Sequence, residues 1–387
     1  MATSNIRYGT GVTREIGLDF KDMGAKNVGV FIDPNLYKMN APPVVTVLQS
    51  LQDNNIKFKI FSDISIEPTD GSFKRAIEFA SSDNFDAFAA IGGGSTMDTA
   101  KAANLYSTHP PEDFLDYVNP PIGKGMPPPG ISKPLITVPT TAGTGSETTG
   151  VAIFDFEARN YKTGIAHRVL KPTLGLIDPN NTLTLPPAVA AASGFDVLCH
   201  SLESFTALPF NRRSPRPPTP MLRPAYQGSN PISDYWSLKA LEMTSQYLHR
   251  TYKDPHDEEA RSQMMLAATY AGIGFGNGGV HLCHGMSYPI SGLAHAELKY
   301  IPGHGYPQDR PMVPHGISVI MNAPAVFRFT ASSNPTRHRL CAKTMGAKGY
   351  DSLPDQDMGK LLSDTIIGLM QKLDVPNGLK ALGYTEP

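Results

Sequence analysis

Residues 85–101 read FDAFAAIGGGSTMDTAK, and this stretch decides the fold class. Its apolar start predicts a buried strand, the glycines at 92–94 predict a tight turn, and the remainder predicts the beginning of a helix. Glycines let a backbone approach a phosphate closely, and a helix N-terminus adds free N–H groups and the positive end of the helix dipole. Because the pattern is not G-x-G-x-x-G, an ordinary turn and a phosphate site are both open on local grounds.

Strands and helices alternate through the first half of the chain. Apolar runs predict further strands at 28–32, 57–61, 135–138 and 174–177, and helical stretches lie at 72–81 and 96–105. This alternation is typical of a parallel sheet with helices on both faces, whose ligands bind at the carboxyl ends of the strands. After Pro186-Pro187 the pattern becomes helical, at 188–206, 233–250, 257–275 and 357–373. We therefore predict an α/β domain over residues 1–187 and an all-α domain over residues 188–387.

Composition narrows the classes of partner and compartment. The net charge is −1 and charged residues make up 18 %, so nothing indicates nucleic acid or an anionic membrane as a partner. No apolar run approaches the ~20 residues that span a bilayer. Three widely spaced cysteines argue against a disulfide framework and favour a reducing compartment. The start, MATSNIRYGTG, shows no signal segment, so we expect a cytosolic protein or an organelle protein without its presequence.

Two further features near predicted strand ends can bind a nucleotide. The loop at 138–150, VPTTAGTGSETTG, gathers hydroxyls and glycines that suit phosphate or ribose oxygens, although a surface loop has the same composition. Asp33 ends an early strand, where an acid can accept hydrogen bonds from a ribose 2′-hydroxyl and repel a 2′-phosphate. A helix N-cap beside Pro34 explains Asp33 equally well.

A candidate metal site begins in the segment GFDVLCHSLE. Asp196 and His200 are four residues apart and therefore share one helix face, although such a pair by itself is more often ordinary helix surface. Histidines also occur in GVHLCHGMSYP and VPHGIS, with His281 and Cys283 as nearby alternative ligands. One carboxylate and three imidazoles suit Fe²⁺, Zn²⁺, Mn²⁺ or Ni²⁺. The predicted ligands are Asp196, His200, His284 and His315.

Together these segments resemble the iron-containing alcohol dehydrogenases, over residues 5–387. The most specific parts are residues 92–101, 139–147 and 196–200 and the pair HGM and PHG around His284 and His315. The resemblance implies a dehydroquinate synthase-like fold, with a dinucleotide-binding α/β domain followed by a helical domain. It implies catalysis through the four metal ligands named above, with iron(II) expected and zinc as the alternative. It implies NAD as cofactor, contacted by Asp33, Gly93, Gly94, Ser95, Asp98, Thr140, Thr141, Thr144 and Lys162.

Further segments resemble one mitochondrial branch of this family more closely, among them FLDYVNPPIGKG, RPAYQGSNPISD and GIGFGNGGVHLCHGMSYPISGL. This resemblance implies transfer of hydride from 4-hydroxybutyrate to 2-oxoglutarate, giving succinic semialdehyde and D-2-hydroxyglutarate, with the NAD staying bound. Both substrates carry a carboxylate, which arginine pairs with bidentately. Of the arginines at 212, 213, 216 and 223 we favour Arg223 as the substrate clamp, with a solvated loop charge as the alternative. We expect small hydroxy and oxo acids as partners, and a homo-oligomer.

The chain departs from the family pattern at three places. Tyr288 stands where many members have a further active-site histidine, and Glu67 stands where many have an asparagine near the cofactor. The sequence ends at Pro387, where the family usually continues with more helix, so we expect an incomplete helical domain. Two other functions stay open: an alcohol dehydrogenase that exchanges free NAD(H), and a metal-binding relative without turnover.

Overall fold

The computed structural model describes residues 3–159, 161–219, 222–292, 300–309 and 311–385. The chain divides into two compact units. The N-terminal unit contains residues 3–141 and 145–183, and the C-terminal unit contains residues 142–144 and 184–385. Among the described residues, no helix combines the length and the apolar character needed to cross a membrane.

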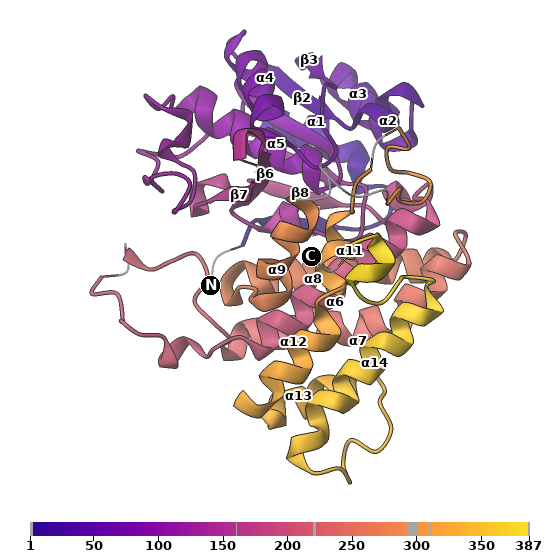
Figure 1. The fold of residues 1–387 in the computed structure, drawn as a ribbon. Coiled ribbons are helices and arrows are strands. Elements are labelled where there is room, and N and C mark those ends of the chain that lie inside the picture. The colour runs from indigo at the N-terminus through magenta and orange to yellow at the C-terminus, as the bar shows by residue number, and fades with distance from the viewer. Residues whose placement is uncertain (1–2, 160, 220–221, 293–299, 310, 386–387) are drawn as a thin grey trace. The chain divides into compact units, whose positions relative to one another are not determined.

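A six-stranded sheet organises the N-terminal unit, in the order β1-β8-β5-β4-β2-β3. Three of its strands, β2, β3 and β8, are labelled in Figure 1. Every neighbouring pair is parallel, which confirms the predicted sheet. The register sets Ile32 beside Ile91 and Gly92 beside Pro139, so the segments that follow β2, β4 and β5 leave the same edge. The strands are β1 (Asn5–Tyr8), β2 (Asn27–Ile32), β3 (Lys57–Phe61), β4 (Ala87–Gly92), β5 (Leu135–Pro139) and β8 (Leu174–Ile177).

Helices cover both faces of this sheet because successive strand residues point to opposite sides. Val28, Val30 and Ile32 of β2 pack in one core with Phe20 of α1 and Val47 of α3. The alternate residues of β2 and β4, such as Phe31 and Phe88, pack in a second core with the alanines of α4 and α5. The helices are α1 (Ile16–Asp22), α2 (Pro34–Lys38), α3 (Pro42–Asp53), α4 (Asp70–Ser81) and α5 (Gly94–Thr108).

An antiparallel hairpin, which the sequence analysis did not predict, also belongs to this unit. It pairs β6 (Val151–Phe156) with β7 (Tyr161–Ala166) in a separate two-stranded sheet. Phe154 of β6 lies 5.2 Å from Phe73 of α4, ring centre to ring centre, in a third apolar core. The hairpin matters for the site because its strands carry Asp155 and Lys162.

The C-terminal unit is built from helices, as predicted. Its central helix α6 contacts α7, α8 and α11. Close packing at α11 requires a glycine, because a Cβ on Gly316 would lie 1.8 Å from the carbonyl oxygen of Ala192. The helices are α6 (Pro187–Thr206), α7 (Pro231–Lys253), α8 (Glu258–Gly278), α9 (Leu282–Gly292), α11 (His315–Ile320), α12 (Ala323–Thr330), α13 (Pro335–Thr344) and α14 (Met358–Lys372).

Candidate metal centre and nucleotide loops

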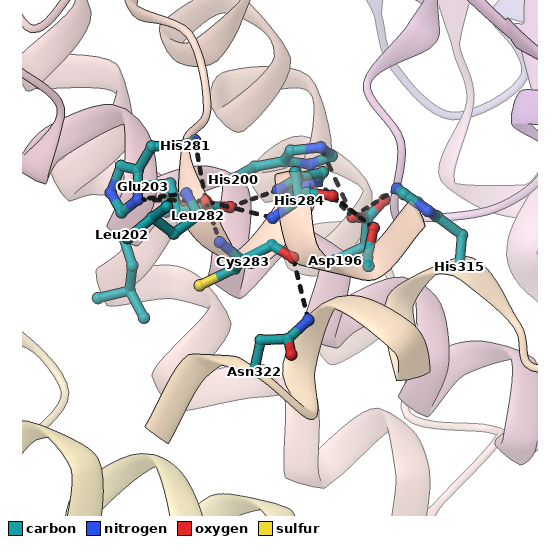
Figure 2. Close-up of polar contacts among 12 residues, drawn as sticks. Asp196, His200, Leu202, Glu203, His281, Leu282, Cys283, His284, His315 and Asn322 are labelled. Atoms are coloured by element: carbon teal, nitrogen blue, oxygen red, sulfur yellow. Dashed lines mark hydrogen bonds and ion pairs between the residues drawn. The ribbon is translucent and has the colours of Figure 1, made fainter. Parts of the chain in front are cut away.

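Four side chains from three helices converge in the C-terminal unit (Figure 2). Asp196 Oδ1 lies 3.3 Å from Nε2 of His284, 3.5 Å from Nε2 of His200 and 3.6 Å from Nε2 of His315. Asp196 and His200 are one turn apart on α6, His284 is on α9, and His315 is the first residue of α11. The structure therefore brings together all four residues that the sequence analysis named as metal ligands.

The polar atoms of this cluster fit a divalent metal. Asp196 Oδ1 and His284 Nε2 are buried and have no hydrogen-bond partner among the described residues, as is also true of His200 Nδ1. Leaving such atoms unpaired costs roughly 1–3 kcal/mol each unless something else satisfies them. Metal bonds of about 2.0–2.1 Å place neighbouring ligand atoms about 3.0–3.4 Å apart, close to the separations found here. Asp196, His200 and His284 form a group of metal-ligating type, and His315 adds a fourth nitrogen.

Burial and neighbouring charges give two of these residues, His200 and Asp196, the protonation state that a metal ligand needs. Burial lowers the pKa of His200 to about 3, so its imidazole is neutral at pH 7, as a ligand must be. Its ring is held by Phe275, which stacks on it at 3.9 Å. Burial raises the pKa of Asp196, but the surrounding imidazoles lower that pKa by more, so the carboxylate is ionised. His315 is 29 % exposed at its side chain, which leaves one side of the cluster open.

Glu203 is a functional residue that the sequence analysis missed. Its side chain is fully buried, and Oε1 accepts hydrogen bonds from the backbone N–H groups of His281 (2.9 Å), Cys283 (2.8 Å) and His284 (3.3 Å). The carboxylate therefore lies at the N-terminus of α9, where an anion is favoured. Its Oε2 contacts Nδ1 of His284 and so points Nε2 of that ring towards Asp196. The signal available in the sequence was its position three residues after His200, on the same helix.

The two alternative ligands, His281 and Cys283, are less suited to bind a metal. His281 accepts a hydrogen bond from Leu282 N at Nδ1 (2.8 Å) and pairs through Nε2 with Thr206 Oγ1 (3.0 Å), so both ring nitrogens are engaged. Burial raises the pKa of the Cys283 thiol well above its ordinary value, which disfavours the thiolate that binds metals.

The predicted phosphate turn follows β4 and opens α5. Gly93 is the N-cap of α5, and a Cβ on it would lie 3.1 Å from Thr141 Cγ2, so the turn packs closely on the segment after β5. Gly94 begins the helix, and Ser95 follows it. Thr140 donates its N–H to Gly92 O at 3.1 Å, which ties the two loops together. Thr140 is buried and Thr141 half-buried, whereas Thr144 belongs to the C-terminal unit.

Asp98 is a cofactor candidate whose carboxylate already has partners in the protein. Oδ1 accepts from the hydroxyl of Ser146 at 2.6 Å, and Oδ2 accepts from the backbone N–H of Ile153 at 3.0 Å. The fully buried ammonium of Lys101 lies beside it and donates to Ser146 Oγ at 2.6 Å. Asp98 thus links α5 to the hydroxyl-rich loop and to β6, and its contact with the cofactor stays a prediction.

Asp33 and Lys162 also contact other residues of the protein. Asp33 is the N-cap of α2, with Oδ1 accepting from the N–H groups of Asn35 (2.9 Å) and Leu36 (3.1 Å). No contact among the described residues uses Oδ2 of Asp33, so the ribose role stays a prediction beside the cap. Lys162 is buried between Glu67 and Asp155, with Nζ–O distances of 2.7 and 3.2 Å.

Arg223 lies in the segment between α6 and α7. Its side chain is exposed, and it forms no ion pair with another residue in the described part of the chain. The carboxylate clamp assigned to it stays a prediction.

Comparison with known proteins places these sites in a family. A model described as "Iron-containing alcohol dehydrogenase" matches residues 3–179, and one described as "Fe-containing alcohol dehydrogenase family, C-terminal" matches residues 225–301. The chain is 58 % identical over 386 residues to the mitochondrial hydroxyacid-oxoacid transhydrogenase of Bos taurus, covering all of this chain and 81 % of that protein. The Homo sapiens protein of the same name is 57 % identical over 386 residues, with the same coverage.

Solved structures share the fold at lower identity. An alcohol dehydrogenase from Oenococcus oeni superposes with a TM-score of 0.84 at 23 % identity, covering 99 % of this chain and 89 % of that one. A 1,3-propanediol oxidoreductase superposes with a TM-score of 0.83 at 22 % identity, with the same coverage.

Proposed function

Because this chain belongs to the iron-containing alcohol dehydrogenase family, we propose that it catalyses hydroxyacid–oxoacid transhydrogenation. The reaction moves hydride from 4-hydroxybutyrate to 2-oxoglutarate, and a bound NAD would supply the hydride acceptor and donor between them. The products are succinic semialdehyde and D-2-hydroxyglutarate. The observation that supports this proposal most is the identity of 57–58 % across the whole chain with mammalian proteins named for that activity.

The metal centre supplies the first part of the proposed chemistry. Asp196, His200, His284 and His315 would hold a divalent ion, with iron(II) expected and zinc as the alternative. When bound, such an ion supplies Lewis acidity towards the hydroxyl or keto oxygen of the substrate. Glu203 keeps Nε2 of His284 aimed at the ligand cluster by contacting the opposite ring nitrogen.

The glycine turn and the hydroxyl-rich loop supply the second part. The N-terminus of α5 at Gly93, Gly94 and Ser95 would receive the pyrophosphate of NAD, because free N–H groups and the helix dipole both favour an anion. Thr140, Thr141 and Thr144 would contribute hydroxyls, and Asp33 would accept from the adenosine ribose. Retention of the nucleotide implies ping-pong kinetics, because one acid leaves before the other enters.

The test of this proposal omits free cofactor. The purified, metal-loaded chain is mixed with 4-hydroxybutyrate and 2-oxoglutarate, and 2-hydroxyglutarate is measured. We expect product without added NAD and parallel lines in a double-reciprocal plot. Strict dependence on added NAD, with simple alcohols preferred, would identify an ordinary alcohol dehydrogenase instead. Bound NAD without any redox change would identify a metal-binding relative without turnover.

Compartment and assembly belong to the same proposal. The mammalian relatives are named mitochondrial, and we propose the same location for this protein. We also propose a homo-oligomer, which light scattering coupled to size-exclusion chromatography would detect as a multiple of the 41.8 kDa chain mass.

A further inference from the structure

Glu67 occupies an unusual place beside the glycine turn of the N-terminal unit. Its backbone has φ = 55°, in the left-handed region that residues other than glycine rarely adopt. The surroundings hold it there from two sides. Its N–H donates to Ser95 Oγ at 3.2 Å, and the next residue, Pro68, accepts a hydrogen bond from Asp155 N at 2.7 Å. Glu67 is therefore fixed against both the first turn of α5 and strand β6.

The side chain of Glu67 adds a third connection. Oε2 lies 2.7 Å from Nζ of Lys162 on β7, and the Lys162 side chain is only 1 % exposed. Asp155 on β6 contacts the same ammonium from the neighbouring strand. Burial would lower the pKa of Lys162, but Glu67 and Asp155 raise it, so the ammonium stays charged.

The charges of this cluster indicate what Lys162 can do. One ammonium faces two carboxylates, so the cluster carries a net charge of −1. With two carboxylates beside it, this ammonium carries no excess positive charge with which to attract a phosphate. Lys162 is therefore suited to donate a hydrogen bond from a fixed position, and Glu67 supplies much of that fixation. Fixing a long, flexible side chain before a ligand arrives lowers the entropy lost on binding.

We propose that Glu67 is a positioning residue that slows release of the bound dinucleotide, by holding Lys162 with its carboxylate and Ser95 with its backbone N–H. This inference rests on the proposed function, in which NAD binds at the N-terminus of α5, which contains Ser95. Glu67 acts through Lys162, so its effect depends on Lys162 being present.

The experiment measures NADH release from the metal-loaded chain, by stopped-flow fluorescence with excess NAD as competitor. Glu67→Gln keeps the shape of the side chain and removes its charge. We expect release about tenfold faster than in the wild type, equivalent to about 1.4 kcal/mol. For any variant that loses its cofactor during purification, equilibrium titration with NADH measures the affinity for the nucleotide.

The decisive comparison repeats Glu67→Gln in a Lys162→Met background. Lys162→Met leaves the carboxylates of Glu67 and Asp155 without their shared ammonium, so neutralising Glu67 there removes a repulsion. We expect Glu67→Gln to leave release unchanged or to slow it in this background. The same tenfold acceleration in both backgrounds would overturn the inference, because it would show a role independent of Lys162.

A matched control separates this effect from the general loss of an ion pair. Asp83 forms a 2.7 Å pair with Lys59 and precedes β4, at the strand end opposite the glycine turn. Asp83→Asn should release NADH at the wild-type rate. If the wild type binds NADH but Glu67→Gln also releases it at the wild-type rate, this inference alone is wrong. If the wild type binds no NADH, the proposed function itself fails.

Discussion

Buried charged side chains are used in opposite ways by the metal centre and by the nucleotide loops. At the metal centre, Asp196 Oδ1 and His284 Nε2 face each other without a hydrogen-bond partner in the described part of the protein. Near the glycine turn, both oxygens of Asp98 accept hydrogen bonds from neighbouring residues, and the ammonium of Lys162 lies between two carboxylates. The first arrangement leaves room for a metal ion, which we propose it binds, whereas the Asp98 carboxylate is satisfied by residues of the protein.

This difference tells which side chains are binding groups and which are supports. A side chain whose polar atoms converge without partners is a candidate ligand, because its desolvation is otherwise uncompensated. A side chain whose polar atoms are all paired, such as Asp98, stabilises the loops around it. We therefore expect substitutions at the metal centre to remove a ligand outright, and substitutions near the glycine turn to act through stability or rate.

The largest effect is expected from His284→Ala. It removes one of the converging nitrogens and leaves Glu203 and Asp196 without their shared partner. Elemental analysis of the purified variant should find no stoichiometric metal, and transhydrogenation should be lost. NADH binding, measured by fluorescence titration, should persist because the proposed nucleotide loops lie mainly in the other unit. Full metal content in this variant would contradict the ligand assignment.

A smaller effect is expected from Glu203→Gln. The carboxylate orients His284 from behind, and loss of such an outer partner lowers metal affinity about 10–100-fold. Competition with a fluorescent chelator measures this change. Glu242→Gln is the control, since Glu242 is an exposed partner of Lys239 on α7 and should leave metal affinity unchanged. Equal metal affinity in the Glu203 and Glu242 variants would remove Glu203 from the metal centre.

Asp98→Asn tests whether Asp98 stabilises the loops of the N-terminal unit. Its amide keeps one acceptor but withdraws the charge beside the buried ammonium of Lys101. We expect the free energy of unfolding in urea to fall by about 1–3 kcal/mol, with the metal content unchanged. If NADH affinity is lost while stability is retained, Asp98 is instead a direct contact of the cofactor.

The smallest effect is expected from Asp33→Asn, which keeps the acceptor for the two capped N–H groups and removes the charge. Repulsion between a half-buried carboxylate and a 2′-phosphate is screened by solvent, so we expect a change of about 1 kcal/mol in favour of NADP. Titration with NADPH and NADH gives the affinity ratio in both proteins. An unchanged ratio would leave Asp33 with its capping role alone.

The sequence predicted much of the regular structure but missed several strands and several of the shorter helices. The apolar runs at β2, β3, β5 and β8 and the long helices were confirmed within a few residues. β1 and the β6–β7 hairpin were missed. β1 has only four residues, two exposed and two half-buried, and β6 combines buried and half-buried positions. Hairpin pairing also depends on the partner strand and on side-chain packing such as that of Phe154.

For the same reason, the sequence reveals the metal ligands more readily than the residues that support the sites. Asp196 and His200 are recognisable from local spacing, whereas Glu203 resembles any polar helix residue until α9 covers it. Asp98 was expected to contact the cofactor, and its partner Ser146 lies 48 residues away. Glu67 was noted only as a departure from the family pattern, and its partner Lys162 lies 95 residues away. Pairs that distant in sequence become visible only in the fold.

In the proposed reaction, the hydride travels between the two acids on a nucleotide that does not leave. The direct measurement uses 4-hydroxybutyrate deuterated at C4, with 2-oxoglutarate and an excess of unlabelled free NADH. Mass spectrometry of the 2-hydroxyglutarate then reports which hydride arrived at C2. We predict nearly complete deuterium at C2, independent of the concentration of free NADH. Unlabelled product, with deuterium appearing in the free NADH pool, would contradict the account and identify an enzyme that exchanges its cofactor.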